Sequence, residues 1–151
     1  MSKTTVVCVE DNFNKAHLTG AILMEAAKAG GFVIEGHAKV NASSGRPGLE
    51  VQTGALVGSI TTTEAKSTNT RAEVDVGPSV LYAAIHEFGG IIKPIRAKML
   101  SWIGDTGERI FANLVQIPAR PYMRPAIDEN EDRVVKAVET EVKRQLDKVG
   151  K

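Results

Sequence analysis

Residues 117–132 read IPARPYMRPAIDENED, and this stretch decides how the last part of the chain is built. Each of its prolines fixes its own φ angle and pushes the preceding residue toward an extended conformation. Residues 117–125, which we call the strap, are therefore expected to form a stiff extended segment that carries two arginines, a tyrosine and a methionine. A stiff segment of this composition is typical of an interface, because little chain entropy is lost on docking. The alternative is a strap that folds against its own sheet.

The part of the chain that follows the strap has the pattern of one long helix. Pro125 suits a first helical turn, where its missing N–H would be unpaired in any case. The acidic run at 128–132 lies where the positive end of the helix dipole favours negative charge. A single apolar stripe then continues to the end of the chain through Ile127, Val134, Val138, Val142, Leu146 and Val149.

The N-terminal part predicts a short strand followed by a long helix. Residues 4–9 are rich in β-branched side chains, as strands are. Apolar residues then recur at helical spacing, which predicts a helix over residues 12–40 with Asp11 or Asn12 as its cap. The pair Gly30–Gly31 is expected to weaken or bend this helix, or to let another backbone approach closely.

The middle of the chain predicts strands around one short helix. Residues 41–53 have the composition of a loop, and 55–63 and 71–76 read as a hairpin. Residues 79–89 change to a helical period, with a cap at Ser79, an apolar face at 81, 84, 85 and 88, and an end at Gly89. Two further strands, 91–103 and 109–117, are expected on either side of a turn.

These elements predict one α+β domain over residues 1–151. A long N-terminal helix and a C-terminal helix would pack on a small, mostly antiparallel β-sheet, with the short helix between strands. The hydrophobic content of 42% and the charged content of 25% are ordinary for a globular chain. The single cysteine, Cys8, cannot form an internal disulfide and is expected to be a buried thiol. No export signal and no apolar run of membrane length is expected.

The charge distribution disfavours nucleic acid as the main partner. The formal net charge is +1, and basic and acidic residues balance along the chain: four and four over 1–42, seven and seven over 43–118, eight and seven over 119–151. One local exception is Lys93, Arg96 and Lys98, which lie near Trp102. A small nucleic-acid-binding module using this segment is an alternative. Against it, basic residues also protect edge strands from pairing, and a lone tryptophan in an apolar strand is commonly core.

No pattern of residues predicts catalysis, a cofactor or a metal site. His86–Glu87 resembles the start of a zinc-protease motif, but the position of the second histidine is Gly90. A hydrolase that depends on His86 and Glu87 is therefore the lesser alternative. Glu87 is instead expected to form a structural ion pair with Arg120 or Arg124.

Three motifs in this order resemble the phage virion morphogenesis proteins: TGALVGSI at 53–60, YAAIHEFGG at 82–90 and IPARPYMRPAIDEN at 117–130. These are small head–tail joining or tail completion proteins of tailed bacteriophages and prophages. The likeness extends from about Ala38 to the C-terminus. Tyr122 and Met123 are mild departures from the family, which often has Phe and Leu at these positions.

The resemblance implies a structural virion protein and no enzyme, at the head–tail junction or the tail end, assembled in the cytoplasm of the bacterial host. Its partners would be copies of itself in a ring, such as a hexamer, and neighbouring connector or tail proteins, with no cofactor, small-molecule substrate or membrane. Rings need head-to-tail contacts between two different patches, for which the loop 41–53 and the strap are the expected elements. The implied interface or structural residues are Tyr82, Glu87, Phe88, Gly89, Arg120, Pro121, Tyr122, Met123, Arg124 and Pro125.

Overall fold

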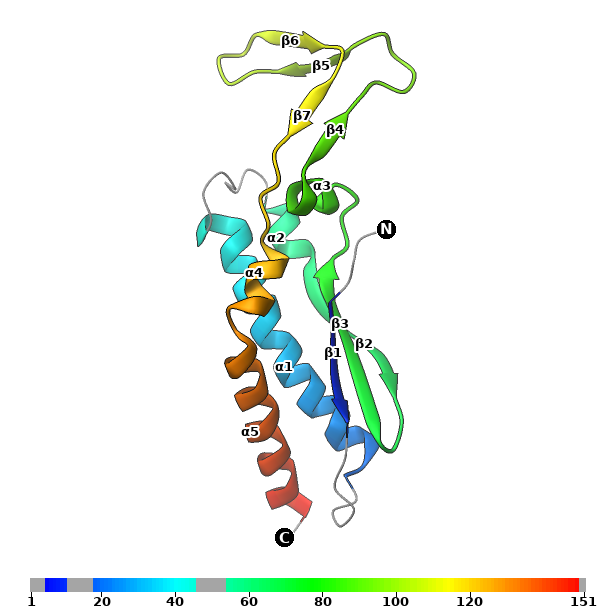
Figure 1. The fold of residues 1–151 in the computed structure, drawn as a ribbon, viewed down its shortest axis with the longest axis vertical. Helices are drawn as coiled ribbons and strands as arrows, with labels where there is room; N and C mark the ends of the chain where they lie inside the picture. The colour runs from blue at the N-terminus through cyan, green and yellow to red at the C-terminus, as the bar shows by residue number, and fades with distance from the viewer. Residues whose placement is uncertain (1–4, 11–17, 46–53, 150–151) are drawn as a thin grey trace.

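The structure is a computed structural model that describes residues 5–10, 18–45 and 54–149 (Figure 1). Its elements are β1 (Thr5–Glu10), α1 (Gly20–Val40), the π-helical turn η1 (Asn41–Gly45), α2 (Ala55–Ser59), β2 (Ile60–Ser67), β3 (Arg71–Pro78), α3 (Ala83–Phe88), β4 (Gly90–Ile92), β5 (Leu100–Ile103), β6 (Arg109–Ala112), β7 (Val115–Ile117), α4 (Met123–Asp128) and α5 (Glu131–Val149). The expected α+β class is confirmed. Within the described ranges, no helix combines the length and the apolarity that a membrane crossing requires.

The body of the molecule is a three-stranded antiparallel sheet with the order β1-β3-β2. Along β3, alternate residues point to opposite faces, so that Ala72, Val74 and Val76 are buried while the residues between them are only partly covered. The buried face packs against α1, and α5 packs along α1 (Figure 1). The same alternation turns Cys8 outward between Val7 and Val9, so the expectation of a buried thiol is wrong.

Helix α1 begins at Gly20, where the hydroxyl of Thr19 accepts from the N–H of Ile22 at 3.4 Å. The expected caps at 11 and 12 lie outside the described residues. The helix continues through Gly30 and Gly31. These glycines allow close packing on two sides, because a Cβ at Gly30 would lie 3.1 Å from atoms of α5 and a Cβ at Gly31 would lie 2.6 Å from the Thr62 side chain in the sheet. The neighbours at both glycines are side-chain atoms, so the close packing occurs without the approach of another backbone that was expected here.

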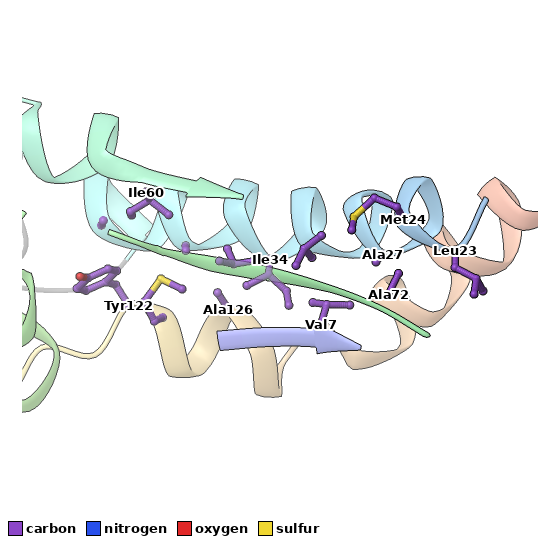
Figure 2. Packing of buried hydrophobic residues seen from close by; sticks show 14 of the residues in the cluster. Val7, Leu23, Met24, Ala27, Ile34, Ile60, Ala72, Tyr122 and Ala126 are labelled. Atoms are coloured by element: carbon purple, nitrogen blue, oxygen red, sulfur yellow. The ribbon is translucent and has the colours of Figure 1, made fainter. Parts of the chain in front are cut away.

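The core follows from this packing and runs along α1 (Figure 2). Leu23, Ala27 and Ile34 on α1 face the sheet residues, and Tyr122 and Ala126 close the end of the core next to Ile60. A polar contact also joins α1 to the sheet. The carboxylate of Glu35 accepts from the N–H of Thr62 at 2.8 Å and from Lys39 Nζ at 2.6 Å. Partial burial alone would raise the pKa of Glu35, but these two donors outweigh it and lower that pKa.

Replacing Gly31 with valine tests the close approach of α1 to the sheet. The new side chain would overlap Thr62 and Val74, and overpacking of this kind costs about 1–3 kcal/mol. We expect the free energy of unfolding in urea to fall by that amount. The matched control is Gly36→Val, because no described residue outside the surrounding helical turns lies within 4 Å of a Cβ at Gly36. We expect this variant to stay within about 0.5 kcal/mol of the wild type. Equal stability of the two variants would contradict the packing described here.

The chain differs from the expected strands between residues 54 and 78. Residues 55–59, expected at the start of a strand, form the short helix α2 instead, in which the N–H of Gly58 donates to the carbonyl of Gly54 at 2.8 Å. The β-branched run that favours a strand begins only at Ile60, which is fully buried. The expected hairpin of β2 and β3 is confirmed, while residues 46–53 of the expected loop lie outside the described residues.

The C-terminal region contains two helices where one was expected. α4 ends at Asp128 and α5 begins at Glu131. The break lies at Asn130, whose buried side chain donates to the carbonyl of Ala126 at 3.1 Å, while its own carbonyl accepts from the N–H of Val134 at 3.0 Å. Only the acidic residues at 131 and 132 therefore lie in the first turn of a long helix, where its dipole favours them.

The two expected strands after Gly89 are four short ones, which build a projection that we call the arm (residues 90–117). β4 pairs with β7 to form a stalk, and β5 pairs with β6 to form a head across its end (Figure 1). Residues 93–99 bend between β4 and β5 because Pro94 cannot donate to a ladder. The arm extends away from the body beyond α3.

Candidate functional site

The motif residues around 82–90 and 117–125 meet where α3 contacts the strap, and we call this contact the joint. Helix α3 buries Ala83 and Glu87. The expected apolar face is therefore wrong: Leu81 is fully exposed and Phe88 is exposed as well. The buried face of α3 carries a carboxylate because its neighbour is polar backbone.

Glu87 caps helix α4 from another element of the fold. Its Oε2 accepts from the N–H groups of Tyr122 at 2.8 Å and Met123 at 2.9 Å, and its Oε1 accepts from the N–H of Arg124 at 3.0 Å. These groups start α4 and have no partner inside the helix, and Tyr122 at the N-cap makes no side-chain cap. A carboxylate is favoured at this end of a helix, and charge-assisted hydrogen bonds are strong.

Three more hydrogen bonds hold the strap in place. The N–H of Arg120 donates to the carbonyl of His86 at 2.7 Å, and the hydroxyl of Tyr122 donates to the carbonyl of Ala83 at 3.4 Å. The side-chain amide of Asn41, just after α1, donates to the carbonyl of Tyr122 at 3.1 Å. Tyr122 is only 1% exposed, and burial together with the nearby Glu87 raises the pKa of its phenol. The joint thus ties α1, α3 and α4 to one another.

Gly89 connects α3 to β4, the first strand of the stalk, and therefore also belongs to the joint. Its φ of 68° and ψ of 179° belong to a region that only glycine occupies readily. The expected end of the helix at Gly89 is therefore confirmed, although the conformation differs from the left-handed one that commonly ends helices. A Cβ at this position would lie 2.7 Å from the backbone nitrogen of Ala119 and 2.9 Å from the carbonyl oxygen of Ile117. Gly89 therefore both ends α3 and lets the strap pass close to it.

The structure separates the expected site residues into two groups. Glu87, Tyr122 and Met123 are buried, and Gly89 is half-buried. Tyr122 and Met123 therefore pack inside the protein, and the expectation that they are contact residues on its surface is not met. Pro125 and Arg120 are half-buried. The exposed members are Tyr82, Phe88, Pro121 and Arg124.

The expected partner of Glu87 was an arginine side chain, and the structure shows a different arrangement. Its carboxylate is occupied by backbone N–H groups instead of the guanidinium of Arg120 or Arg124. Asn41 and Ala83 were not predicted as members of the joint, because they contribute through an amide and a carbonyl to a residue about 80 and about 40 positions away.

The chemistry of the joint is that of a fixed contact. Both oxygens of Glu87 accept hydrogen bonds, and neighbouring residues on a helix, such as His86 and Glu87, do not face each other. The ring of His86 lies edge-on to Tyr82, with centroids 5.8 Å apart. In the part of the chain that the structure describes, no three His, Cys, Asp or Glu side chains could hold a metal ion together.

A pocket of about 220 Å³ opens beside the joint, between α3 and α4. Its lining includes the apolar residues Phe88, Met123 and Ile127 and the charged residues Arg124 and Asp128. The sequence pattern did not predict this pocket, because it is formed by two short helices that are far apart in the chain.

The fold and the joint define a small α+β protein in which the motif residues connect α1, α3 and α4 and hold the base of a projecting arm. The chain belongs to the phage virion morphogenesis family, whose model matches residues 35–144, more than half of its 151 residues. It is therefore a bacteriophage protein with a structural or assembly role in the virion. Neither the curated proteins nor the solved structures contain a match to this chain.

Proposed function

We propose that this protein is a component of the head–tail connector or the tail end that forms a ring of identical subunits and joins neighbouring virion components without catalysis. The observation that carries this proposal is the exposed apolar surface of the arm. Of the 16 exposed large hydrophobic residues among the described ones, eight lie in the arm: Ile91, Ile92, Ile95, Met99, Trp102, Ile103, Phe111 and Leu114. Exposed apolar surface of this extent marks a protein interface.

The arm also lacks a core of its own. Each of its two sheets has only two strands, and an isolated two-stranded hairpin is marginally stable in water. The joint holds the base of the arm rigidly against the body, so the arm is presented to a neighbour in a fixed direction. A fixed arm on one side and a body on the other suit the head-to-tail contacts from which rings are built.

The proposed absence of catalysis is supported by the state of Glu87. A general base needs a free oxygen within reach of the proton that it removes, and both oxygens of Glu87 are engaged with backbone donors. The lesser hydrolase alternative therefore has no acid–base pair in this arrangement.

One observation favours nucleic acid as a second partner. Trp102 is 41% exposed, so the expectation that it lies in the core is wrong, and Lys93, Arg96 and Lys98 are exposed on the same arm. An exposed aromatic with basic neighbours can stack on single-stranded bases. Most of the exposed apolar residues of the arm are aliphatic, however, and such residues suit a protein partner better.

Deleting the gene from a phage that carries it tests the proposed role. We expect electron microscopy to show heads and tails that are unjoined or tails with an aberrant end, and the infectious titre to fall until a plasmid copy is supplied. Light scattering during size-exclusion chromatography of the purified protein should show a ring or an assembly that grows with concentration. Normal particles at a normal titre would contradict the role in the virion, and a strict monomer at every concentration would contradict the ring.

A further inference from the structure

The bend between β4 and β5 carries the most exposed apolar side chain of the arm. Ile95 is 97% exposed, and it lies between Lys93 on one side and Arg96 and Lys98 on the other, all of them exposed. We call residues 93–98 the basic knob. Over the whole arm, four basic residues stand against two acidic ones, so its charge is positive.

The pocket beside the joint complements the basic knob, because it offers an apolar lining and carboxylates. Its lining is apolar at Phe88, Met123 and Ile127, and it also carries the cation of Arg124 and the carboxylate of Asp128. Glu131 and Asp132, both exposed, follow at the start of α5. A volume of about 220 Å³ has room for an aliphatic side chain. The carboxylates of Asp128 in the lining and of the two residues that begin α5 outnumber the one cation of the lining, Arg124, and so suit a partner with positive charge.

The knob and the pocket are held apart within one subunit. The stalk of the arm extends from α3 away from the body, so the bend between β4 and β5 lies well beyond the pocket between α3 and α4 (Figure 1). Gly89 and the hydrogen bond from Arg120 to His86 fix the base of this stalk. The knob therefore cannot fill the pocket of its own subunit in this conformation.

We propose that the basic knob of one copy docks into the pocket of a second copy, with Ile95 inserted between α3 and α4 and the cations of the knob facing Asp128, Glu131 and Asp132. The occupant is a second copy because the same chain carries both complementary surfaces, and these surfaces are different patches, as a head-to-tail contact requires. This inference rests on the self-assembly in the proposed function and assigns the two surfaces that make it.

Charge reversal on each side tests the contact. The knob variant carries Lys93→Glu, Arg96→Glu and Lys98→Glu, and the rim variant carries Asp128→Lys, Glu131→Lys and Asp132→Lys. We expect each variant to weaken self-association in sedimentation velocity by about tenfold or more, and a protein with both sets of changes to recover most of the loss. Ile95→Ser should weaken association without a change of charge.

The matched control reverses three exposed lysines on α5, Lys136→Glu, Lys143→Glu and Lys148→Glu, which gives the same change of net charge as the knob variant. This control should associate like the wild type. The knob lies on an exposed bend, so its variants should unfold at the same temperature as the wild type. Thermal unfolding therefore distinguishes the loss of a contact from the loss of the fold.

Several outcomes would overturn the docking. One is a knob variant that associates as well as the control, and another is a double variant that stays as weak as the single ones. A knob variant that still assembles but loses salt-dependent binding to single-stranded DNA, or to a purified connector or tail protein, would assign the knob to that partner instead. A wild-type protein that never associates would end this inference, whereas the gene deletion reports on the virion role independently.

Discussion

Glu87→Gln is expected to lower the free energy of unfolding by about 3 kcal/mol, because it removes the charge from a carboxylate that accepts three buried or half-buried backbone N–H groups. An amide of the same shape keeps one acceptor oxygen, but it turns an NH₂ group toward donors that then lack a partner. Glu87 is 8% exposed, so water can replace the lost acceptor only in part. The midpoint of thermal unfolding should fall by roughly 6–12 °C.

A second measurement places this effect at the joint. In hydrogen exchange of the native protein, the amides of Tyr122 and Met123 should lose protection in Glu87→Gln more than those of β3 do, because only the former donate to the carboxylate. Glu139→Gln is the matched control, since Glu139 is exposed on α5 and its replacement should change stability by about 0.5 kcal/mol or less. If Glu87→Gln behaved like this control, the cap on α4 would have no energetic role.

The elements that the sequence predicted well are those set by local signals. The end of α3 at Gly89 follows from one residue that tolerates a positive φ. The pairing of β2 with β3 follows from β-branched runs on both sides of a polar turn. The close packing at Gly30–Gly31 follows from the absence of a side chain, although the neighbours are side chains instead of the expected backbone and could not be named in advance.

The joint could not be predicted in detail, because its contacts join backbone groups that are distant in the chain. A carboxylate on an amphipathic helix reads as a solvent-facing residue or as half of an ion pair, yet Glu87 faces inward toward donors 35–37 residues away. With Glu87 facing inward, Phe88 at the end of α3 is exposed, and so is Leu81, which precedes the helix. When a helix packs against polar groups, its sequence has no apolar periodicity from which the buried face could be predicted.

The arm differs from its predicted structure for a related reason. Apolar residues in a strand predict burial, so Trp102 was expected in the core, but the structure places it on a two-stranded sheet, where it is exposed. A hydrophobic pattern indicates that a surface is to be buried, but it does not indicate whether the same chain or a partner buries it. For a protein that acts in assembly, core residues and contact residues therefore look alike in the sequence.

Gly89→Ala is expected to destabilise the protein by about 3 kcal/mol or more, since it combines a backbone conformation that costs about 1–3 kcal/mol for other residues with a steric overlap. The new Cβ would lie 2.7 Å from the backbone nitrogen of Ala119, and neither backbone can yield without opening the pairing of Gly90 with Ile117. Urea unfolding measures the loss. Limited proteolysis should then cut between residues 90 and 117 sooner than in the wild type, because the stalk is no longer held.

Gly107→Ala separates the two causes of this effect. Gly107 also has a positive φ, of 86°, but apart from its chain neighbours no residue of the described ranges lies within 4 Å of a Cβ built on it. Its replacement should therefore cost only the conformational part, about 1 kcal/mol, and should leave the base of the arm protected from protease. A difference of about 2 kcal/mol between the two variants would measure the close passage of the strap beside α3. Equal losses would mean that the strap can move aside, and that the joint does not set the direction of the arm.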